Sequence, residues 1–314
     1  MERTWKTAIK TRARRQLRAY KTYKYLLILM LPALVWYIIF AYQPMYGLTI
    51  AFKDFQVMKG VDASPWVGLK HFERMFSGTS DFFKIMRNTL MLSFYNIIFG
   101  FPAPIILAVL LSELRSTRYK KVVQSITYMP YFFSWVVLAG ILREILSPSS
   151  GAVNQIIQAL GGQPIYFLTD PNWFVVMLVA TGIWRGCGWD SVVYLASITN
   201  IDPQLYEAAT IDGASRLRQI RSITLPCLMP VINIMLIMRV GAVLNSSFDQ
   251  IFNLYSPAVY ETADVIDTYV YRVGLVNFDY SFSTAVGLFK NVIGLILVLG
   301  SDRIAKKMGQ SGLF

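Results

Sequence analysis

Charged side chains lie inside several segments that are otherwise long and apolar. They are Arg185 and Asp190 in residues 173–201, Arg239 in residues 227–248 and Lys290 in residues 280–301. A charge in the middle of a membrane span is costly, so such residues normally face a bundle interior or a watery cavity, or pair with one another. The chemistry open to them is recognition of a polar or charged solute. Ion pairs that only hold helices together are the alternative.

Aromatic and polar residues lie close to these charges in the sequence. Rings offer stacking faces and polar side chains offer hydrogen bonds, a combination that suits a sugar. We therefore predict a solute pathway whose candidate residues are Arg185, Trp189, Asp190, Tyr194, Arg239, Asn245 and Asp249, with Trp184 nearby.

The charge of the solute stays open. Arg185, Arg239 and Lys290 outnumber Asp190, and an excess of positive charge in a low-dielectric bundle needs compensation. A carboxylate on an acidic glycan would supply it, but so would a partner subunit or the ends of half-helices. The predicted outer loops carry net negative charge, which disfavours attraction of an anion. An acidic and a neutral oligosaccharide both remain possible cargoes.

The sequence offers little for catalysis or metal binding. His71 is the only histidine, and the two cysteines, Cys187 and Cys227, are far apart, so neither a His-based metal centre or triad nor a zinc site is expected. No GxxxxGK[ST] phosphate-binding loop occurs in the chain. We expect this chain not to be an enzyme and to hold no metal or cofactor.

The composition indicates a membrane protein. Hydrophobic residues make up 55% of the 314 residues and charged residues only 15%, whereas soluble domains have about 25% charged residues. Segments of about 20 apolar residues are long enough to span a bilayer. We predict an all-α, six-helix transmembrane bundle with spans at residues 25–42, 90–112, 122–142, 173–201, 227–248 and 280–301.

The distribution of lysine and arginine predicts the orientation of the bundle. Most of these residues outside the spans lie in residues 1–24, 113–121, 216–221 and 303–307. Because cytoplasmic loops are enriched in positive charge, both termini are expected in the cytoplasm. The net charge of +12 then reflects topology, and no nucleic acid is expected as a partner.

The first 24 residues form a basic cytoplasmic segment, followed by a permease domain over residues 25–314. The segment is not a cleaved signal peptide, because its apolar run is a full span and no small-x-small cleavage site follows. Apolar residues recur every four positions in it, at Trp5, Ile9, Ala13 and Leu17. It is expected either to lie as a helix on membrane lipid or to act only as a topology determinant.

The connection over residues 202–226 has complete helix signals. Asp202 is expected to cap a helix, Pro203 to occupy its first position and Gly213 to end it. A second short helix over residues 215–223 would run up to a stop at Leu225-Pro226. Two short helices at a membrane surface would make a rigid feature that another protein can contact.

The same connection carries a known signature. Glu207-Ala208-Ala209, Gly213 and Ile223-x-Leu225-Pro226 match the pattern EAA-x3-G-x9-I-x-LP without departure. The chain thereby resembles the permease subunits of binding-protein-dependent ABC importers, over about residues 24–314. Arg87-Asn88-Thr89-Leu90 resembles the start of that family's core transmembrane domain. The stretches YQPMYGLTIAFKDF, SPWVGLKHF, VYETADVIDTYVYRVGL and FSTAVGLFKNVIGLILVL resemble the branch that imports complex oligosaccharides and polysaccharide fragments.

The resemblance implies a type I importer fold of the maltose type and a role as half of the transmembrane pathway. It also implies a second permease subunit of a different chain, two ABC ATPase subunits that bind ATP and magnesium, an extracytoplasmic solute-binding protein, and location in a bacterial cytoplasmic membrane. The loop would couple this chain to an ATPase through Glu207, Ala208, Ala209, Asp212, Gly213, Leu225 and Pro226. The outer acids Asp249, Glu261, Asp264 and Asp267 would contact the binding protein.

Two other functions compete with this interpretation. A secondary sugar transporter driven by an ion gradient would normally show internal repeats and broken helices, and no repeat is evident, although Arg185 and Asp190 in one span resemble a proton relay. A membrane-embedded glycosyltransferase would need paired carboxylates or a metal site, and the outer acids are better explained by contact with a binding protein.

Overall fold

The computed structural model describes residues 23–78, 80–245 and 247–307, which are helical apart from turns, loops and one isolated bridge between Lys53 and Trp66. The chain divides into two compact units, Met1–Gly68 and Leu69–Phe314. Nearly all of the predicted basic segment, residues 1–24, lies outside the described residues.

The first unit is built on one long apolar helix. Helix α2 (Lys24–Tyr37) continues through the π turn η1 (Ile38–Tyr42) into the 3₁₀ segment η2 (Gln43–Phe52). The predicted span at residues 25–42 is therefore part of a longer helical run. A single-turn helix, α3 (Gly60–Ala63), follows, and Trp66 folds back so that its ring stacks on that of Phe52 at 5.6 Å.

The second unit begins with α4 (Lys70–Phe76) and a long segment made of α5 (Phe82–Tyr95), the π turn η3 (Asn96–Gly100) and α6 (Pro102–Glu113). The helix starts at Phe82, earlier than the predicted span at residues 90–112. The π turn lies just before Pro102 and Pro104. A proline lacks the N–H that a regular helix needs, and the π turn, which has one residue more than an α-helical turn, accommodates the missing hydrogen bonds.

The third predicted span is wrong as a single helix. In place of a straight helix over residues 122–142, α7 (Thr117–Tyr128) and the 3₁₀ turn η4 (Met129–Phe132) are followed by α8 (Trp135–Ile145), bent by 103° from the first part. Pro130 tightens the end of the first helix, and the Ser134 side chain caps the second by accepting from the Val137 N–H at 3.3 Å. Both halves are apolar, so hydropathy does not reveal the break. Helix α9 (Ala152–Ala159) follows α8.

Helix α10 (Pro171–Thr199) is continuous over 29 residues despite its two charges. The Asp170 carboxylate caps it by accepting from the Asn172 and Trp173 N–H groups at 2.9 and 3.0 Å. It packs along α6 and against α7. Tyr194, Leu195 and Ile198 share an apolar core with Ala108 and Leu111 of α6 and with Leu228.

After α11 (Pro203–Ile211), the chain enters a second long helix made of α12 (Arg216–Gln219), the π turn η5 (Ile220–Thr224) and α13 (Leu225–Gly241). The predicted stop at Leu225-Pro226 is therefore wrong, because η5 accommodates the missing N–H of Pro226 and the helix runs on. Helix α13 ends at Gly241, so the predicted span at residues 227–248 is too long at its end.

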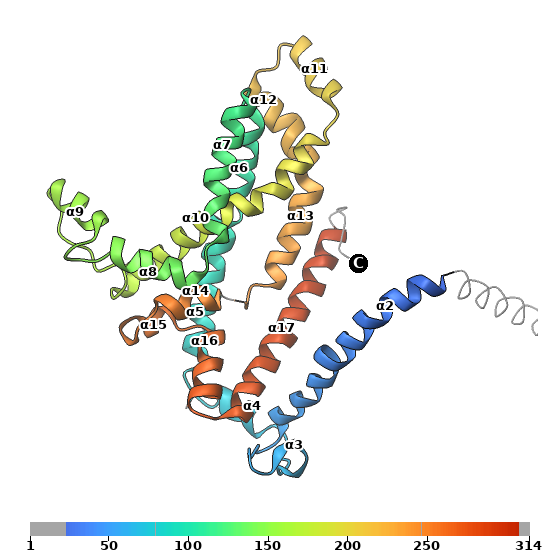
Figure 1. Ribbon diagram of the computed structural model, residues 1–314, viewed down its shortest axis with the longest axis vertical. Helices are drawn as coiled ribbons and strands as arrows, with labels where there is room; N and C mark the ends of the chain where they lie inside the picture. The colour runs from blue at the N-terminus through green and yellow to red at the C-terminus, as the bar shows by residue number, and fades with distance from the viewer. Residues whose placement is uncertain (1–22, 79, 246, 308–314) are drawn as a thin grey trace, which may run out of the picture. The chain divides into compact units, whose positions relative to one another are not determined.

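The last part of the chain folds at the end of the second unit opposite α11 and then returns (Figure 1). It consists of α14 (Phe248–Leu254), η6 (Pro257–Val259), α15 (Tyr260–Ala263), α16 (Ile266–Tyr271), η7 (Arg272–Val276) and α17 (Tyr280–Lys307). Helix α17 packs against α13 and α16.

Within the described residues, four helical runs are long and apolar enough to cross a membrane, or five if the bent pair α7–α8 counts as one span. The four are Lys24–Phe52, Phe82–Glu113, Arg216–Gly241 and Tyr280–Lys307. Helix α10, which carries Arg185 and Asp190, is not among them. The fold is thus all-helical with several apolar helices, as expected.

Candidate functional site

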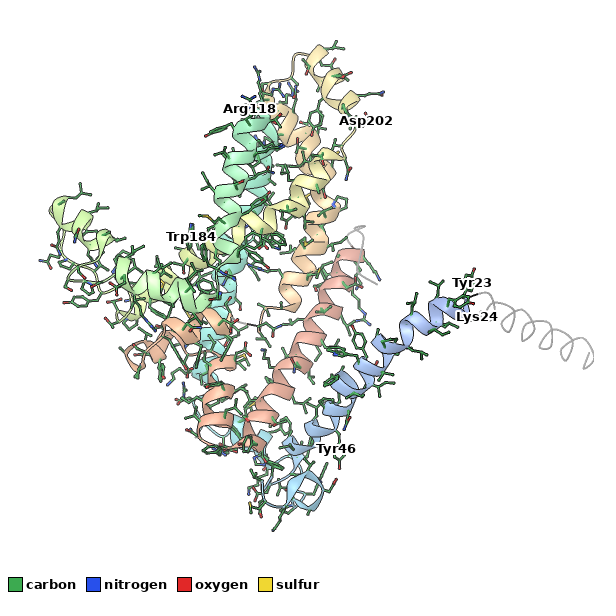
Figure 2. The ribbon with its side chains drawn as sticks, in the orientation of Figure 1. Tyr23, Lys24, Tyr46, Arg118, Trp184 and Asp202 are labelled. Atoms are coloured by element: carbon green, nitrogen blue, oxygen red, sulfur yellow. The ribbon has the colours of Figure 1, made fainter. Side chains whose placement is uncertain are left out.

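Helix α11 stands at one end of the second unit, where Figure 2 labels Asp202. Its predicted caps are confirmed: the Asp202 carboxylate accepts from the Gln204 N–H at 3.0 Å, Pro203 is the first helical residue, and Gly213 follows the helix with φ +73°. A side chain at Gly213 would be strained by this φ even though the space around it is open.

No residue of α11 is buried within the chain. Glu207 and Ala208 are exposed, and so is Asp212, which caps the end of the helix. Two large apolar side chains are exposed as well, Leu205 at 47% and Ile211 at 86%. Sequence reasoning missed these two, although apolar residues in a short polar connection are a signal that a partner covers them.

Side-chain hydrogen bonds attach α11 to the long helix that follows. The Tyr206 and Thr224 hydroxyls are 2.9 Å apart, and the Gln219 amide donates to the Thr210 hydroxyl at 3.1 Å. Gln219 and Thr224 are both buried. Leu225 and Pro226 are the first residues of α13. Two hydrogen bonds therefore join α11 to α12 and η5, which continue into α13.

Four of the predicted pathway residues line one cavity of about 290 Å³ between α6, α10 and α13. They are Trp189, Asp190, Tyr194 and Arg239. Two charges of opposite sign thus face one space, but no ion pair within 4.0 Å joins them among the described residues. These four residues bring two aromatic rings, a carboxyl group and a guanidinium group to the wall of the cavity.

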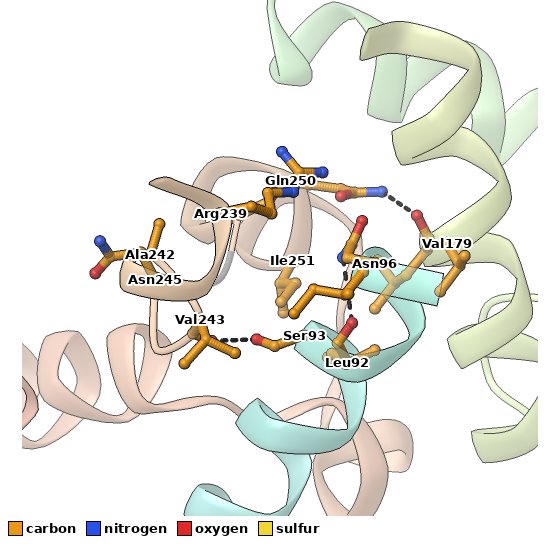
Figure 3. Close-up of a pocket in the computed structure, with 13 residues that line it drawn as sticks. Leu92, Ser93, Asn96, Val179, Arg239, Ala242, Val243, Asn245, Gln250 and Ile251 are labelled. Carbon is orange, nitrogen blue, oxygen red and sulfur yellow. Dashed lines mark hydrogen bonds between the residues drawn. The ribbon is translucent and has the colours of Figure 1, made fainter. Parts of the chain in front are cut away.

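A second cavity, of about 120 Å³, shares Arg239 with the first (Figure 3). It is also lined by Asn245, another of the predicted pathway residues, together with Asn96 and Gln250. The Gln250 amide donates to the Leu178 carbonyl at 2.8 Å and to the Thr181 hydroxyl at 3.0 Å. Arg239 therefore lies where the two spaces meet. Sequence reasoning missed both: Asn96 lies far along the chain from Arg239, and Gln250, which directly follows the candidate Asp249, carries no charge that would single it out.

Two predicted pathway residues are placed elsewhere. Arg185 lines neither cavity, and its guanidinium donates to the carbonyls of Tyr131 and Phe133 at the break in the third span. Asp249 lies at the start of α14, and it also lines neither cavity. Trp184, labelled in Figure 2, is 51% exposed.

Lys290 is neutralised within the chain, because its ammonium forms a salt bridge with Asp267 of α16. Asp264 is also internal: it is 2% exposed and binds Arg272 with both carboxylate oxygens. Burial disfavours the charged form of Arg272, but the hydrogen bonds and charge of Asp264 outweigh this effect and raise the pKa of Arg272. Asp264 is therefore out of reach of an outside partner. Because Asp267 neutralises Lys290, the excess of positive charge inside the bundle is also smaller than the sequence suggests.

The residues of the Arg87-Asn88-Thr89-Leu90 motif anchor this same loop. The Asn88 amide donates to the carbonyls of Glu261 and Asp264 at 2.9 and 3.2 Å, and the Thr89 hydroxyl accepts from the Ile266 N–H at 3.0 Å. Asn88 and Thr89 are both fully buried. The motif thus holds the α15–α16 connection on the first turns of α5. No group of three or more His, Cys, Asp or Glu side chains that could hold a metal occurs in the part of the chain that the structure describes.

Comparison with known proteins is consistent across sequence and structure. The family model described as binding-protein-dependent transport system inner membrane component matches residues 75–310. The polygalacturonan/rhamnogalacturonan transport system permease protein YteP of Bacillus subtilis is 44% identical over 93% of this chain and 90% of its own length. Protein LplB of the same organism is 43% identical over 94% of this chain and 93% of its own length.

A solved structure shares the fold at similar identity. A chain of a bacterial alginate ABC transporter, crystallised in complex with a periplasmic protein that holds an alginate pentasaccharide, superposes with a TM-score of 0.87 and 41% identity. The match covers 94% of this chain and 99% of that chain.

Proposed function

The chain belongs to the family of binding-protein-dependent transport system inner membrane components, and we propose that it lines half of the route for a uronate-containing polysaccharide fragment. It is the permease subunit of an ATP-driven ABC importer of oligosaccharides or polysaccharide fragments in a bacterial cytoplasmic membrane. It is not an enzyme. It works with a second permease subunit, with two ATPase subunits and with an extracytoplasmic solute-binding protein.

The proposed topology has six spans: α2–η2, α5–α6, the bent pair α7–α8, α10, α12–α13 and α17. Both termini lie in the cytoplasm, with residues 1–24 as a basic segment and residues 25–314 as the permease domain. The position of Arg216, Arg218 and Arg221 next to α11 supports this orientation, because basic residues favour the cytoplasmic side. It places the loop anchored by Asn88 outside, where a binding protein docks.

Helix α11 is the proposed contact with an ATPase subunit. Glu207, Ala208, Ala209, Asp212 and Gly213 form its docking end, and Leu225 and Pro226 begin the helix that it moves. The exposed side chains of Leu205 and Ile211 support this role, since an ATPase cleft would cover them. ATP and magnesium bind to the ATPase subunits, and this chain holds no cofactor of its own.

Arg239 carries the proposal of an acidic cargo. Its guanidinium lines both cavities and has no hydrogen bond or ion pair within the described residues, whereas Lys290 is paired with Asp267 and Arg185 with carbonyls. A guanidinium whose N–H donors are not used by neighbouring groups can bind a carboxylate through two parallel hydrogen bonds. Alginate and polygalacturonan, which relatives of this chain handle, are polymers of uronic acids. A neutral oligosaccharide is the competing cargo.

The test is transport by the complete importer in vesicles, with matched neutral and uronate oligosaccharides in competition. We expect the uronate compound to be preferred, and Arg239→Gln to lower its transport about tenfold while leaving transport of any neutral compound nearly unchanged. Transport of the neutral compound alone, with Arg239→Gln behaving like the wild type, would exclude the acidic cargo. Uptake that needs an ion gradient and no ATP would identify a secondary transporter instead.

A further inference from the structure

The break in the third span is held by a side chain of α10. A helix that ends inside a protein leaves its last carbonyls without helical partners. Arg185 supplies donors to two of them: Nη2 donates to the Tyr131 carbonyl at 3.2 Å, and Nε and Nη2 each donate to the Phe133 carbonyl at 3.3 Å. A cation at the C-terminal end of a helix is also favoured by the helix dipole. Arg185 is thus satisfied by the break itself and does not need a solute as its partner.

The Tyr131 ring lies against two residues of α10 that are one turn apart. The guanidinium carbon of Arg185 is 5.2 Å from the centre of the Tyr131 ring, and the Trp189 ring stacks on Tyr131 with centroids 4.8 Å apart and planes 6° apart. Phe132 adds an edge contact to Trp189 at 5.9 Å. The orientation of the Trp189 indole is therefore set by the residues at the break.

A glycine allows this close approach. Gly188 is buried, and a Cβ atom there would overlap the Thr127 carbonyl oxygen of α7. Any larger residue at position 188 would separate α7 from α10 and draw Tyr131 away from Trp189. The contact between the two helices and the position of the indole both depend on the close approach of Gly188 to the Thr127 carbonyl.

Trp189 also lines the cavity that contains Asp190 and Arg239, and it remains 44% exposed. We propose that Tyr131 and Arg185 are positioning residues, which hold the Trp189 indole as a fixed stacking wall for a sugar ring in transit. This inference rests on the proposed function, since it takes the cavity to be part of the sugar route. It assigns to Arg185 a role different from contact with the solute.

A fixed wall matters because a mobile side chain has to be ordered each time a solute binds. The cost of immobilising one such side chain corresponds to a weakening of binding by about three- to tenfold. When the complete importer carries Tyr131→Leu, we therefore expect the amount of sugar transported per ATP hydrolysed to fall about three- to tenfold. Tyr131→Phe keeps the ring and should restore the wild-type value.

The decisive measurement is a double-mutant cycle in reconstituted importer, with sugar transported per ATP as the readout. If Tyr131 acts through Trp189, adding Tyr131→Leu to Trp189→Ala should cause no further loss. Independent, additive losses would overturn the proposal, and so would full activity of Tyr131→Leu. Tyr119→Leu, the same substitution at an exposed ring of α7, is the matched control.

Arg185→Lys gives a second route to the same answer should Tyr131→Leu fail to assemble with its partners. Lysine keeps the charge but lacks the planar fork that reaches two carbonyls, so the same loss and the same absence of additivity with Trp189→Ala are expected. If Arg185→Lys lowers transport equally with and without Trp189, the positioning role is wrong. If no sugar route passes this cavity, Trp189→Ala alone will leave transport unchanged, which separates failure of the proposed function from failure of this inference.

Discussion

The Tyr206 hydroxyl of α11 hydrogen-bonds to the Thr224 hydroxyl of η5 at 2.9 Å, and so ties the exposed helix to the long helix that carries Arg239. Thr224 is 2% exposed, and water cannot easily replace this partner. The link uses no residue that lines either cavity and none of the residues proposed to dock on an ATPase. It offers a way to disturb coupling without touching either.

Tyr206→Phe should weaken this link by about 1 kcal/mol, the usual contribution of one hydrogen bond. We expect ATP hydrolysis stimulated by sugar-loaded binding protein to fall several-fold, with assembly intact. Tyr166→Phe, at a ring that is 59% exposed, is the control and should behave like the wild type. Equal stimulation in both variants would show that α11 is held without Tyr206.

Gly213→Pro should abolish stimulated ATP hydrolysis while membrane insertion stays normal, because proline cannot adopt the positive φ of +73° found there. Glu207→Lys should have the same effect by reversing the charge at the docking end. Gly213→Ala should cause an intermediate loss, with about 1 kcal/mol of strain.

Gly161→Ala is the matched control for that series, since Gly161 has φ +85° and open space around it but lies far from α11 in the chain. It carries the same kind of strain and should leave stimulation intact. Loss of stimulation in Gly161→Ala, or normal stimulation in Gly213→Pro, would argue against α11 as the ATPase contact.

Asn88→Ala should loosen the loop between α15 and α16, because the carbonyl of Asp264, a residue that is 2% exposed, loses its amide donor, and the carbonyl of Glu261 keeps only the donor from Arg87. Leaving such groups unsatisfied costs about 1–3 kcal/mol each. We expect a lower thermal inactivation midpoint and weaker affinity for the binding protein. Asn172→Ala, at an exposed amide, should change neither. An unchanged midpoint for Asn88→Ala would mean that the motif does not anchor the loop.

Loss of the charge of Lys290 should lower the stability of the chain, whereas loss of the charge of Arg239 should change the selectivity between uronate and neutral oligosaccharides. Lys290→Met leaves Asp267, whose side chain is only 23% exposed, without its partner, which should destabilise the chain by about 2 kcal/mol. The selectivity between uronate and neutral oligosaccharides should stay the same. Adding Asp267→Leu should recover part of the stability, because it removes the unpaired charge. A change of selectivity in Lys290→Met would place Lys290 on the sugar route.

Features that depend on neighbours in the sequence were predictable. The Asp202 cap, Pro203 and the glycine at the end of α11 are local, because a capping side chain reaches backbone groups only two or three residues away. Four of the six predicted apolar spans overlap helical runs that are long and apolar enough to cross a membrane, since the cost of placing polar residues in lipid acts on each segment separately. Their ends were less well predicted: α5 starts at Phe82 and α13 ends at Gly241.

The break in the third span illustrates what local reasoning misses. Residues on both sides of it are apolar, so hydropathy is the same for a straight span and for a bent one. The carbonyls freed at the break are satisfied by Arg185, which is 52 residues away from Phe133. A break of this kind is stable only where another helix brings a donor to it.

By itself the sequence determined that the chain is all-helical, which segments are rich in apolar residues, and which residues bring charge into those segments. Only the tertiary structure decided what each charge does: Lys290 pairs with Asp267, Arg185 holds a break, and Arg239 faces a cavity. The reason is physical. The energy of a charge away from water depends on the groups within a few ångströms of it, and in this bundle those groups come from other helices.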